Sequence, residues 1–192
     1  MASRASWAAR RSAGVDPKDR LPAVWPEFQP REILRTLTGA GVDFVVVGGI
    51  AVVLSGYGRA TRDLDIAFAG DAGNLEALGQ VLVGLDSRLR GVGDELAFVP
   101  DAKALAGVQL LTLETSQGWL DVHRTLPGVR SYEALRRRAT RVMLDDVSVL
   151  VASVDDLIAM KRAAWRPQDL VDIEALEAIK RLRGDARATD GD

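Results

Sequence analysis

Cysteine is absent from this 192-residue chain, and histidine occurs once, at His123. Disulfide bonds and thiolate metal sites are therefore excluded, and so is a zinc site built from several histidines. A bound metal would have to be held by oxygen ligands. Aromatic residues make up only 5% of the chain, and we find no RNA-binding module with base-stacking aromatics.

Long apolar runs and a strong net charge are also missing. No run reaches the ~20 residues that a membrane-spanning helix needs. The net charge of −2 gives no global field that would draw the chain onto a membrane or nucleic acid. Residues 1–29 are rich in Ala, Arg and Pro, which superficially resembles a transit peptide, but they lack periodicity and an apolar stretch. We expect a mobile N-terminal arm and a cytoplasmic protein without a membrane partner.

The composition suits one folded domain. Hydrophobic residues make up 47% of the chain and charged residues 27%, which is typical of a globular protein. A chain of this length can bury a core without disulfides. We expect a domain over residues 30–183, preceded by the arm of residues 1–29 and followed by a disordered tail of residues 184–192.

Apolar periodicity and breaker residues predict alternating helices and strands. Helices are expected at residues 31–39, 50–55, 70–85, 131–138, 154–164 and 167–183. Strands are expected at residues 42–47, 64–68, 96–99, 108–114, 119–124, 141–144 and 147–151. This order predicts an α/β (α+β) fold with a small mixed β-sheet flanked by helices.

The most informative feature is a glycine pair followed by two carboxylates. Gly48 and Gly49 end an expected strand, Asp63 and Asp65 lie at the start of the next one, and residues 50–62 separate the pairs. Residues at i and i+2 of a strand point to the same face. Two oxygen ligands on one face suit Mg²⁺, which proteins usually hold by one or two carboxylates plus substrate phosphates. The segment predicts a phosphate-and-metal site, although such carboxylates could instead pair with nearby arginines.

This layout resembles the signature of the nucleotidyltransferase superfamily with the DNA polymerase β-like fold: an apolar residue, Gly, Gly or Ser, a spacer, then Asp-apolar-Asp/Glu-apolar. Residues 56–65 are most similar to the AbiEii-type branch, which includes many toxins of toxin–antitoxin pairs. The resemblance covers about residues 30–180 and implies a minimal nucleotidyltransferase fold. It implies that Asp63 and Asp65 hold Mg²⁺ or Mn²⁺. It also implies that the glycine pair binds the triphosphate, and through backbone alone, because position 49 carries no hydroxyl.

A third carboxylate follows on an expected hairpin. Asp121 alternates with apolar neighbours and therefore faces away from them. The resemblance implies that Asp121 joins Asp63 and Asp65 as a metal ligand or accepts the proton of the nucleophile. Alternatively, Asp121 faces solvent. His123 shares the face of Asp121, but a lone histidine is more often a structural residue, and we assign it no metal.

A second block, residues 155–170, resembles the family pattern Asp-Leu-Ile-x-x-Lys followed by Arg-x-x-Asp-Leu. The resemblance implies that Lys161 is catalytic and reaches the triphosphate, and that Arg166 and Asp169 belong to the nucleotide site. A solvated helix residue is the alternative for Lys161. Trp165 stands where the family usually has Gly, so the local loop differs.

Arginines supply two further candidate contacts. Arg59 and Arg62 precede the first carboxylate pair, and one of them either touches the nucleotide or balances Asp63. A basic stretch further along the chain is either a solvated helix face or a surface for an RNA backbone. Its members are Arg124, Arg130, Arg136, Arg137, Arg138 and Arg141.

Together these features predict an enzyme that transfers a nucleoside monophosphate from a nucleoside triphosphate to a hydroxyl and releases pyrophosphate. By resemblance, the acceptor is the 3′ end of tRNA, and the protein is a toxin with a cognate antitoxin partner. A small molecule such as an aminoglycoside, or a protein hydroxyl, is the alternative acceptor. A catalytically silent regulatory protein is the remaining possibility, and the presence of all three carboxylates counts against it.

Overall fold

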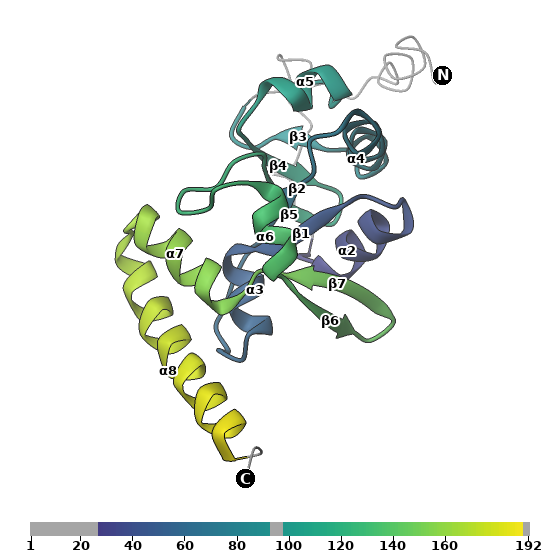
Figure 1. Ribbon diagram of the computed structural model, residues 1–192. Coiled ribbons are helices and arrows are strands. Elements are labelled where there is room, and N and C mark those ends of the chain that lie inside the picture. Colours follow the sequence, from purple (N-terminus) through teal and green to yellow (C-terminus); the bar gives the residue numbers. More distant parts are fainter. Residues whose placement is uncertain (1–26, 93–97, 190–192) are drawn as a thin grey trace.

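A computed structural model describes residues 27–92 and 98–189 of the chain (Figure 1). Within those residues the strands form one mixed, seven-stranded sheet. Neighbouring strands are antiparallel except for the pairs β2–β5 and β1–β7, which are parallel. In spatial order the strands are β3 (Arg88–Leu89), β4 (Leu110–Thr115), β5 (Gly118–His123), β2 (Asp63–Phe68), β1 (Phe44–Val47), β7 (Val147–Val151) and β6 (Thr140–Leu144).

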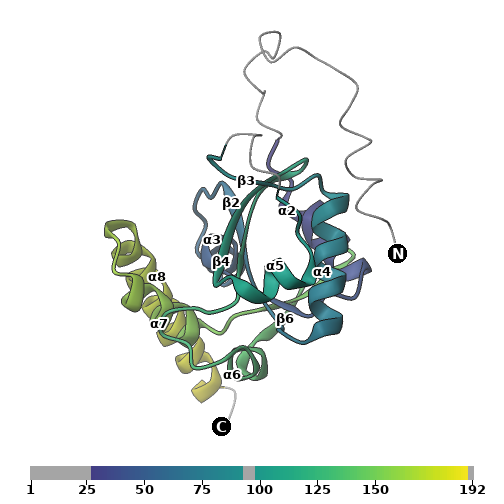
Figure 2. The same ribbon diagram turned by 90° about the horizontal axis from the view of Figure 1, so that it is seen from above.

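Helices cover both faces of this sheet. Figure 2 shows α3, α7 and α8 on one side and α2, α4 and α5 on the other. The helices are α2 (Pro30–Gly39), α3 (Gly48–Leu54), α4 (Ala72–Gly84), α5 (Ala102–Gly107), α6 (Tyr132–Arg138), α7 (Val154–Ala164) and α8 (Pro167–Thr189). This arrangement confirms the predicted fold class.

The core lies where the central strands meet these helices. All four residues of β1 are buried, as its continuous apolar run predicts. In β2 the apolar Leu64 and Ile66 are fully buried, whereas Asp63 and Asp65, which alternate with them, are only partly buried. Because strand side chains alternate between faces, this pattern places the two carboxylates on the face opposite Leu64 and Ile66.

Local capping explains where several helices begin. Asp71, Ser131 and Ser153 each accept a hydrogen bond from the backbone N–H three residues later, which satisfies a donor that the first turn leaves free. At its end, α7 passes through Trp165, whose φ of 49° is in the left-handed region. That conformation sets the turn into α8, at the position where the sequence already indicated a different loop.

Some boundaries differ from the sequence expectations. Helix α8 continues to Thr189, beyond residue 184, where a disordered tail was expected to begin. Strand β3 and helix α5 were not predicted. Of the strand expected at 96–99, residues 96–97 lie outside the described residues, and residues 98–99 are not in a strand. Residues 1–26 of the expected arm also lie outside, whereas Phe28 packs against the core.

None of the helices in the described part of the chain is long and apolar enough to cross a membrane.

Candidate active site

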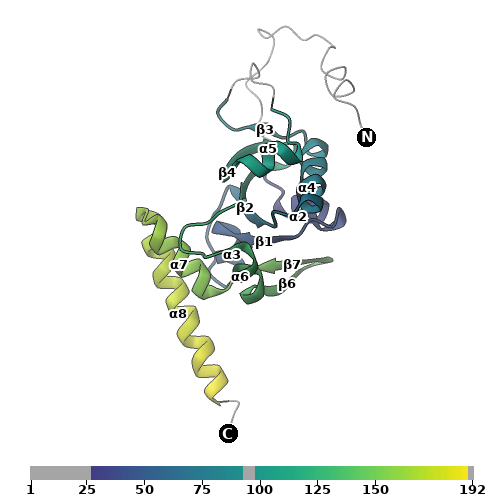
Figure 3. The same cartoon turned by 45° about the horizontal axis from the view of Figure 1, so that its top comes forward.

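Two carboxylates meet at the centre of the sheet because β2 and β5 run parallel and in register. Asp65 pairs with Asp121, and Asp63 pairs with Trp119. Paired residues of neighbouring strands project to the same face. The structure therefore brings Asp65 and Asp121 side by side, with Asp63 displaced two residues along β2. Figure 3 shows β2 between the two groups of helices.

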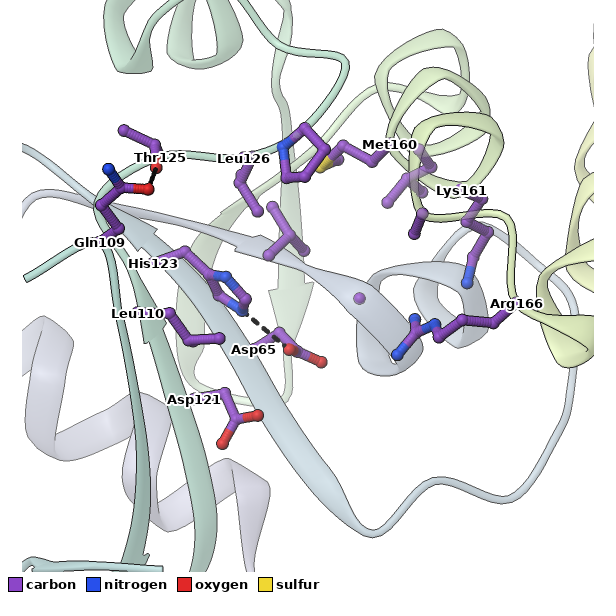
Figure 4. Close-up of a pocket in the computed structure, with 15 residues that line it drawn as sticks. Asp65, Gln109, Leu110, Asp121, His123, Thr125, Leu126, Met160, Lys161 and Arg166 are labelled. Carbon is purple, nitrogen blue, oxygen red and sulfur yellow. Dashed lines mark hydrogen bonds and ion pairs between the residues drawn. The ribbon is translucent and has the colours of Figure 1, made fainter.

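Asp65 is held from two sides. Its Oδ1 lies 3.0 Å from Nε2 of His123, which projects from β5 on the same face (Figure 4). On its other side lies Gly48, at the junction of β1 and α3, with a φ of +63°. A Cβ atom at Gly48 would lie only 2.0 Å from Oδ2 of Asp65. The glycine therefore provides both the left-handed conformation and the room that the carboxylate occupies.

Gly48 gives a matched test of this packing. We expect Gly48→Ala to lower transfer activity at least tenfold and to destabilise the fold by more than Gly41→Ala does. Gly41 has a similar φ of +71° but has open space where its Cβ would lie. Gly41→Ala should therefore show only the conformational cost, about 1–2 kcal/mol. Urea unfolding and transfer assays of both variants measure the difference, and equal effects in the two variants would refute a role for the close contact.

Asp121 is the more buried of the two paired carboxylates. Burial raises the pKa of Asp121, and the negative charge of the nearby Asp65 raises it further. The guanidinium of Arg90 lowers the pKa, and the net result is a pKa of about 6. Arg90 Nη2 lies 2.9 Å from Asp121 Oδ1 and hydrogen-bonds to Oδ2 at 3.0 Å. Oδ1 is buried and accepts no hydrogen bond from the described residues. Arg90 itself lies over the ring of Trp119, 4.9 Å from its centroid.

The raised pKa predicts how Asp121→Asn changes stability in metal-free protein. The folded protein favours the protonated form of the Asp121 carboxyl. The resulting contribution to the free energy of unfolding is fully present below pH 4, near the pKa of the unfolded chain, and is lost as the pH rises through about 6. We therefore expect the variant to match the native protein near pH 4 and to exceed it by up to about 3 kcal/mol at pH 8. Urea unfolding at both pH values, with a chelator present, measures this. A constant difference at the two pH values would contradict the prediction, and the exposed Asp86→Asn is the control.

Asp63 and the residues before it form a separate group. Thr61 Oγ1 donates a hydrogen bond to Asp63 Oδ1 at 3.2 Å. Thr61 Oγ1 also lies so close to Gly49 that a Cβ atom there would have no room. Arg59 Nε lies 2.9 Å from Asp172 Oδ1, and Arg62 makes no ion pair with any described residue. The sequence left two roles open for these arginines, a contact with the nucleotide or an ion pair with Asp63. Neither arginine forms that ion pair in the described parts of the chain.

Lys161 lies in a buried ion cluster at the junction of α7 and α8. Its Nζ lies 3.2 Å from Asp169 Oδ1 and 2.6 Å from Asp172 Oδ2. Asp169 also accepts hydrogen bonds from the backbone N–H and the Nε of Arg166. Burial alone would raise the pKa of Asp169, but these hydrogen bonds outweigh it and hold the pKa below its ordinary value. With Arg59, the cluster holds three cations and two carboxylates, which leaves one positive charge in excess.

These groups surround a pocket of about 670 Å³, within the size range of small-molecule sites. Asp65 and Asp121 line it together with the backbone at Gly48, and Lys161 and Arg166 line it from the helices (Figure 4). Of the described candidates, Gly49, Arg59, Arg62, Asp63 and Asp169 are not among its lining residues.

The donor set fits a hard divalent ion that is shared with a substrate. The described residues contain no group of three or more His, Cys, Asp or Glu side chains arranged to hold a metal. Mg²⁺, however, is usually held by one or two carboxylates together with substrate phosphates rather than by a complete protein cage. Asp65 and Asp121 supply such a pair, and both line the pocket.

Three groups in or next to the site were not found by sequence reasoning. Arg90 follows a two-residue strand in a segment whose pattern is mixed, so nothing in the sequence marked it. Asp172 lies three residues after Asp169, a helical spacing that could have revealed it. The apolar and amide residues that complete the pocket, such as Gln109 and Leu110, carry no motif.

The fold and the paired carboxylates are those of a nucleotidyltransferase-like protein. The chain belongs to the family described as "Nucleotidyltransferase of unknown function (DUF6036)", whose model matches residues 31–186. No curated protein sequence matches it. The AbiEii-type branch remains a prediction.

Two solved structures show the same fold. The lincomycin-bound lincosamide antibiotic adenylyltransferase LnuA is 20% identical with a TM-score of 0.55, over 80% of this chain and 99% of that one. The solution structure of the antibiotic-resistance factor ANT(2'')-Ia is 15% identical with a TM-score of 0.53, over 83% and 90% of the two chains. At these identities the likeness shows the fold alone.

Proposed function

We propose that this protein transfers a nucleoside monophosphate from a nucleoside triphosphate to the hydroxyl of a small molecule and releases pyrophosphate. The observation that carries the proposal is the in-register pair of Asp65 and Asp121, which lines a pocket whose other side holds Lys161 and Arg166. Carboxylates on one side and cations on the other are what a metal-bound triphosphate requires.

The reaction can be assigned to residues of this chain. A divalent ion, Mg²⁺ or Mn²⁺, would be held by Asp65 and Asp121, with Asp63 nearby, and would neutralise phosphate charge. The acceptor oxygen forms a bond to the α-phosphorus, the bond from that phosphorus to the β-phosphate oxygen breaks, and pyrophosphate leaves. Asp121, which lies beside Asp65 and lines the pocket, is the carboxylate placed to accept the hydroxyl proton.

The triphosphate end of the nucleotide is assigned to the cationic side of the pocket. The cluster around Lys161 carries one positive charge in excess of its carboxylates, so an anion next to it is favoured. Gly48 brings bare backbone to the same pocket, and Gly49 follows it. The nucleotide-binding roles of Arg59, Arg62 and Asp169 remain predictions, and Asp169 would act by orienting Lys161 and Arg166.

The basic stretch between Arg124 and Arg141 favours a small acceptor over tRNA, because several of its arginines already have partners within the protein. Arg136 pairs with Asp43, Arg138 pairs with Asp156, and Arg141 donates a hydrogen bond to Ser148. Because internal partners already compensate the first two of these arginines, the stretch offers a weaker field to an RNA backbone than its sequence indicates. Of the two proteins with the same fold, LnuA is a lincosamide antibiotic adenylyltransferase and ANT(2'')-Ia is an antibiotic-resistance factor, and antibiotics of this kind are small molecules. The tRNA acceptor and the antitoxin partner remain predictions.

The direct test supplies purified protein with Mg²⁺, each α-labelled nucleoside triphosphate, and three acceptor pools: small hydroxyl compounds, tRNA and protein. We expect label on a small molecule with one equivalent of pyrophosphate, and calorimetric binding of the triphosphate only with the metal. Absence of both binding and transfer would refute nucleotidyl transfer. Transfer to tRNA or protein alone would refute the small-molecule acceptor and keep the chemistry.

A further inference from the structure

The pocket has two unlike walls on either side of Asp65 (Figure 4). The helical wall carries Lys161 and Arg166. The facing wall comes from the start of β4 and the segment that follows β5, and we name it the acceptor wall. It consists of Gln109, Leu110, Thr125, Leu126 and Pro127.

The acceptor wall carries no ionisable side chain. Leu110 lines the pocket and leaves 47% of its surface exposed, so its side chain is accessible to a ligand there. The wall has two polar members, and Thr125 Oγ1 donates a hydrogen bond of 3.4 Å to Gln109 Oε1. Because this bond uses the amide oxygen of Gln109, its amide N–H donors are left for a ligand. A mostly apolar surface with a few hydrogen-bonding groups is the usual lining of a site for an uncharged organic ligand.

The remaining charges near the pocket argue against charged acceptors. A polycation would need free carboxylates, but the acidic residues that line the pocket, within the described parts of the chain, are Asp65 and Asp121. Both of these carboxylates are assigned to the divalent ion in the proposed function, so the acceptor wall offers a polycation no carboxylate of its own. A polyanionic acceptor would need cations on the acceptor wall, but Lys161 and Arg166, the lysine and arginine that line the pocket in the described parts of the chain, lie on the opposite wall and are assigned to the triphosphate.

We propose that the acceptor is an uncharged amphipathic hydroxyl compound whose apolar part lies on the acceptor wall and whose hydroxyl reaches Asp121. This inference rests on the proposed function, because it assigns the acceptor half of the same site. The triphosphate then occupies the cationic wall, and the two substrates approach the carboxylate pair from opposite sides.

The test compares acceptors that differ in charge. Butyl to octyl glucosides represent the uncharged class, an aminoglycoside the polycations, and total tRNA the polyanions. We expect transfer to the glucosides, with a rate that rises with chain length. Leu110→Glu should lower kcat/KM for the glucosides at least tenfold while leaving the calorimetric Kd for the metal–triphosphate complex unchanged. Val83→Glu is the matched control, because Val83 lies on α4, outside the pocket, and is 48% exposed.

Each other outcome overturns the acceptor assignment in a distinguishable way. Faster transfer to the aminoglycoside or to tRNA would give the acceptor another charge class. A Leu110→Glu variant with weakened triphosphate binding and unchanged glucoside transfer would place the nucleobase on this wall. No transfer to any class, with triphosphate binding intact, would remove the assignment but keep the nucleotide site. Loss of triphosphate binding in the native protein would instead refute the proposed function.

Discussion

Replacement of Asp65 by Asn should reduce nucleotidyl transfer on the order of a thousandfold while the protein stays folded. The two side chains have nearly the same shape, so the variant removes a negative charge and little else. Loss of several kcal/mol of charge stabilisation corresponds to about that factor in rate. Asp65 is also the partner of His123 Nε2, a contact that the Asn oxygen can still make with a protonated ring nitrogen.

The measurement is the initial rate of label transfer at saturating metal, together with urea unfolding to confirm the fold. Asp86→Asn is the matched control, because Asp86 is exposed, lies outside the pocket, and has a left-handed φ of 49° that Asn tolerates. We expect the control to retain native activity. An Asp65→Asn variant that keeps more than a tenth of the native rate would show that this carboxylate does not hold the metal.

Replacement of Asp169 by Asn should cost about 3–5 kcal/mol of folding stability, because it breaks a buried ion pair and leaves cations behind. Asp169 is fully buried and receives hydrogen bonds from both Lys161 and Arg166. Asp172 alone would then compensate Lys161. Since interactions with these cations lower the pKa of Asp169, its stabilising contribution is present above the unfolded pKa near 4 and is lost as pH falls further.

Urea unfolding at pH 7 measures this loss, and Glu177→Gln is the control on the same helix. Glu177 pairs with Arg162 at the surface, where such pairs contribute about 0–1 kcal/mol. If the Asp169 variant lost no more stability than this control, the cluster would not hold α7 and α8 together. Lys161→Met with Asp169→Asn should recover part of the loss, because the double variant removes the buried ammonium together with one of its two carboxylate partners, and Asp172 keeps its ion pair with Arg59.

The sequence predicted the framework better than the details of the site. Continuous apolar runs and helix caps such as Ser131 and Ser153 are local signals, and they placed most helices and strands to within a few residues. The alternation around Asp121 indicated its face, but only the parallel pairing of β2 with β5 sets it beside Asp65. That pairing joins residues 56 positions apart in the sequence, Asp65 and Asp121, and no local pattern encodes it.

The same reason explains what sequence reasoning could not supply. The ammonium of Lys161 was assigned to the triphosphate from a motif, whereas its contacts with Asp169 and Asp172 depend on how α8 folds back on α7. Arg59 reaches Asp172 across more than 100 residues of sequence. The pairing of Arg136 with Asp43 likewise changed the meaning of a basic stretch that looked free in the sequence.

The parallel pairing of β2 and β5 has an evolutionary consequence. Parallel neighbours need a long crossover connection, and here that connection includes Gln109 and the first residue of β4, Leu110, which both line the pocket next to the acceptor. The cationic side comes from a different stretch, the two C-terminal helices. Changes at Gln109 or Leu110 can therefore alter which acceptor fits without touching the helices assigned to the triphosphate, so that substrate range can vary separately from nucleotide binding.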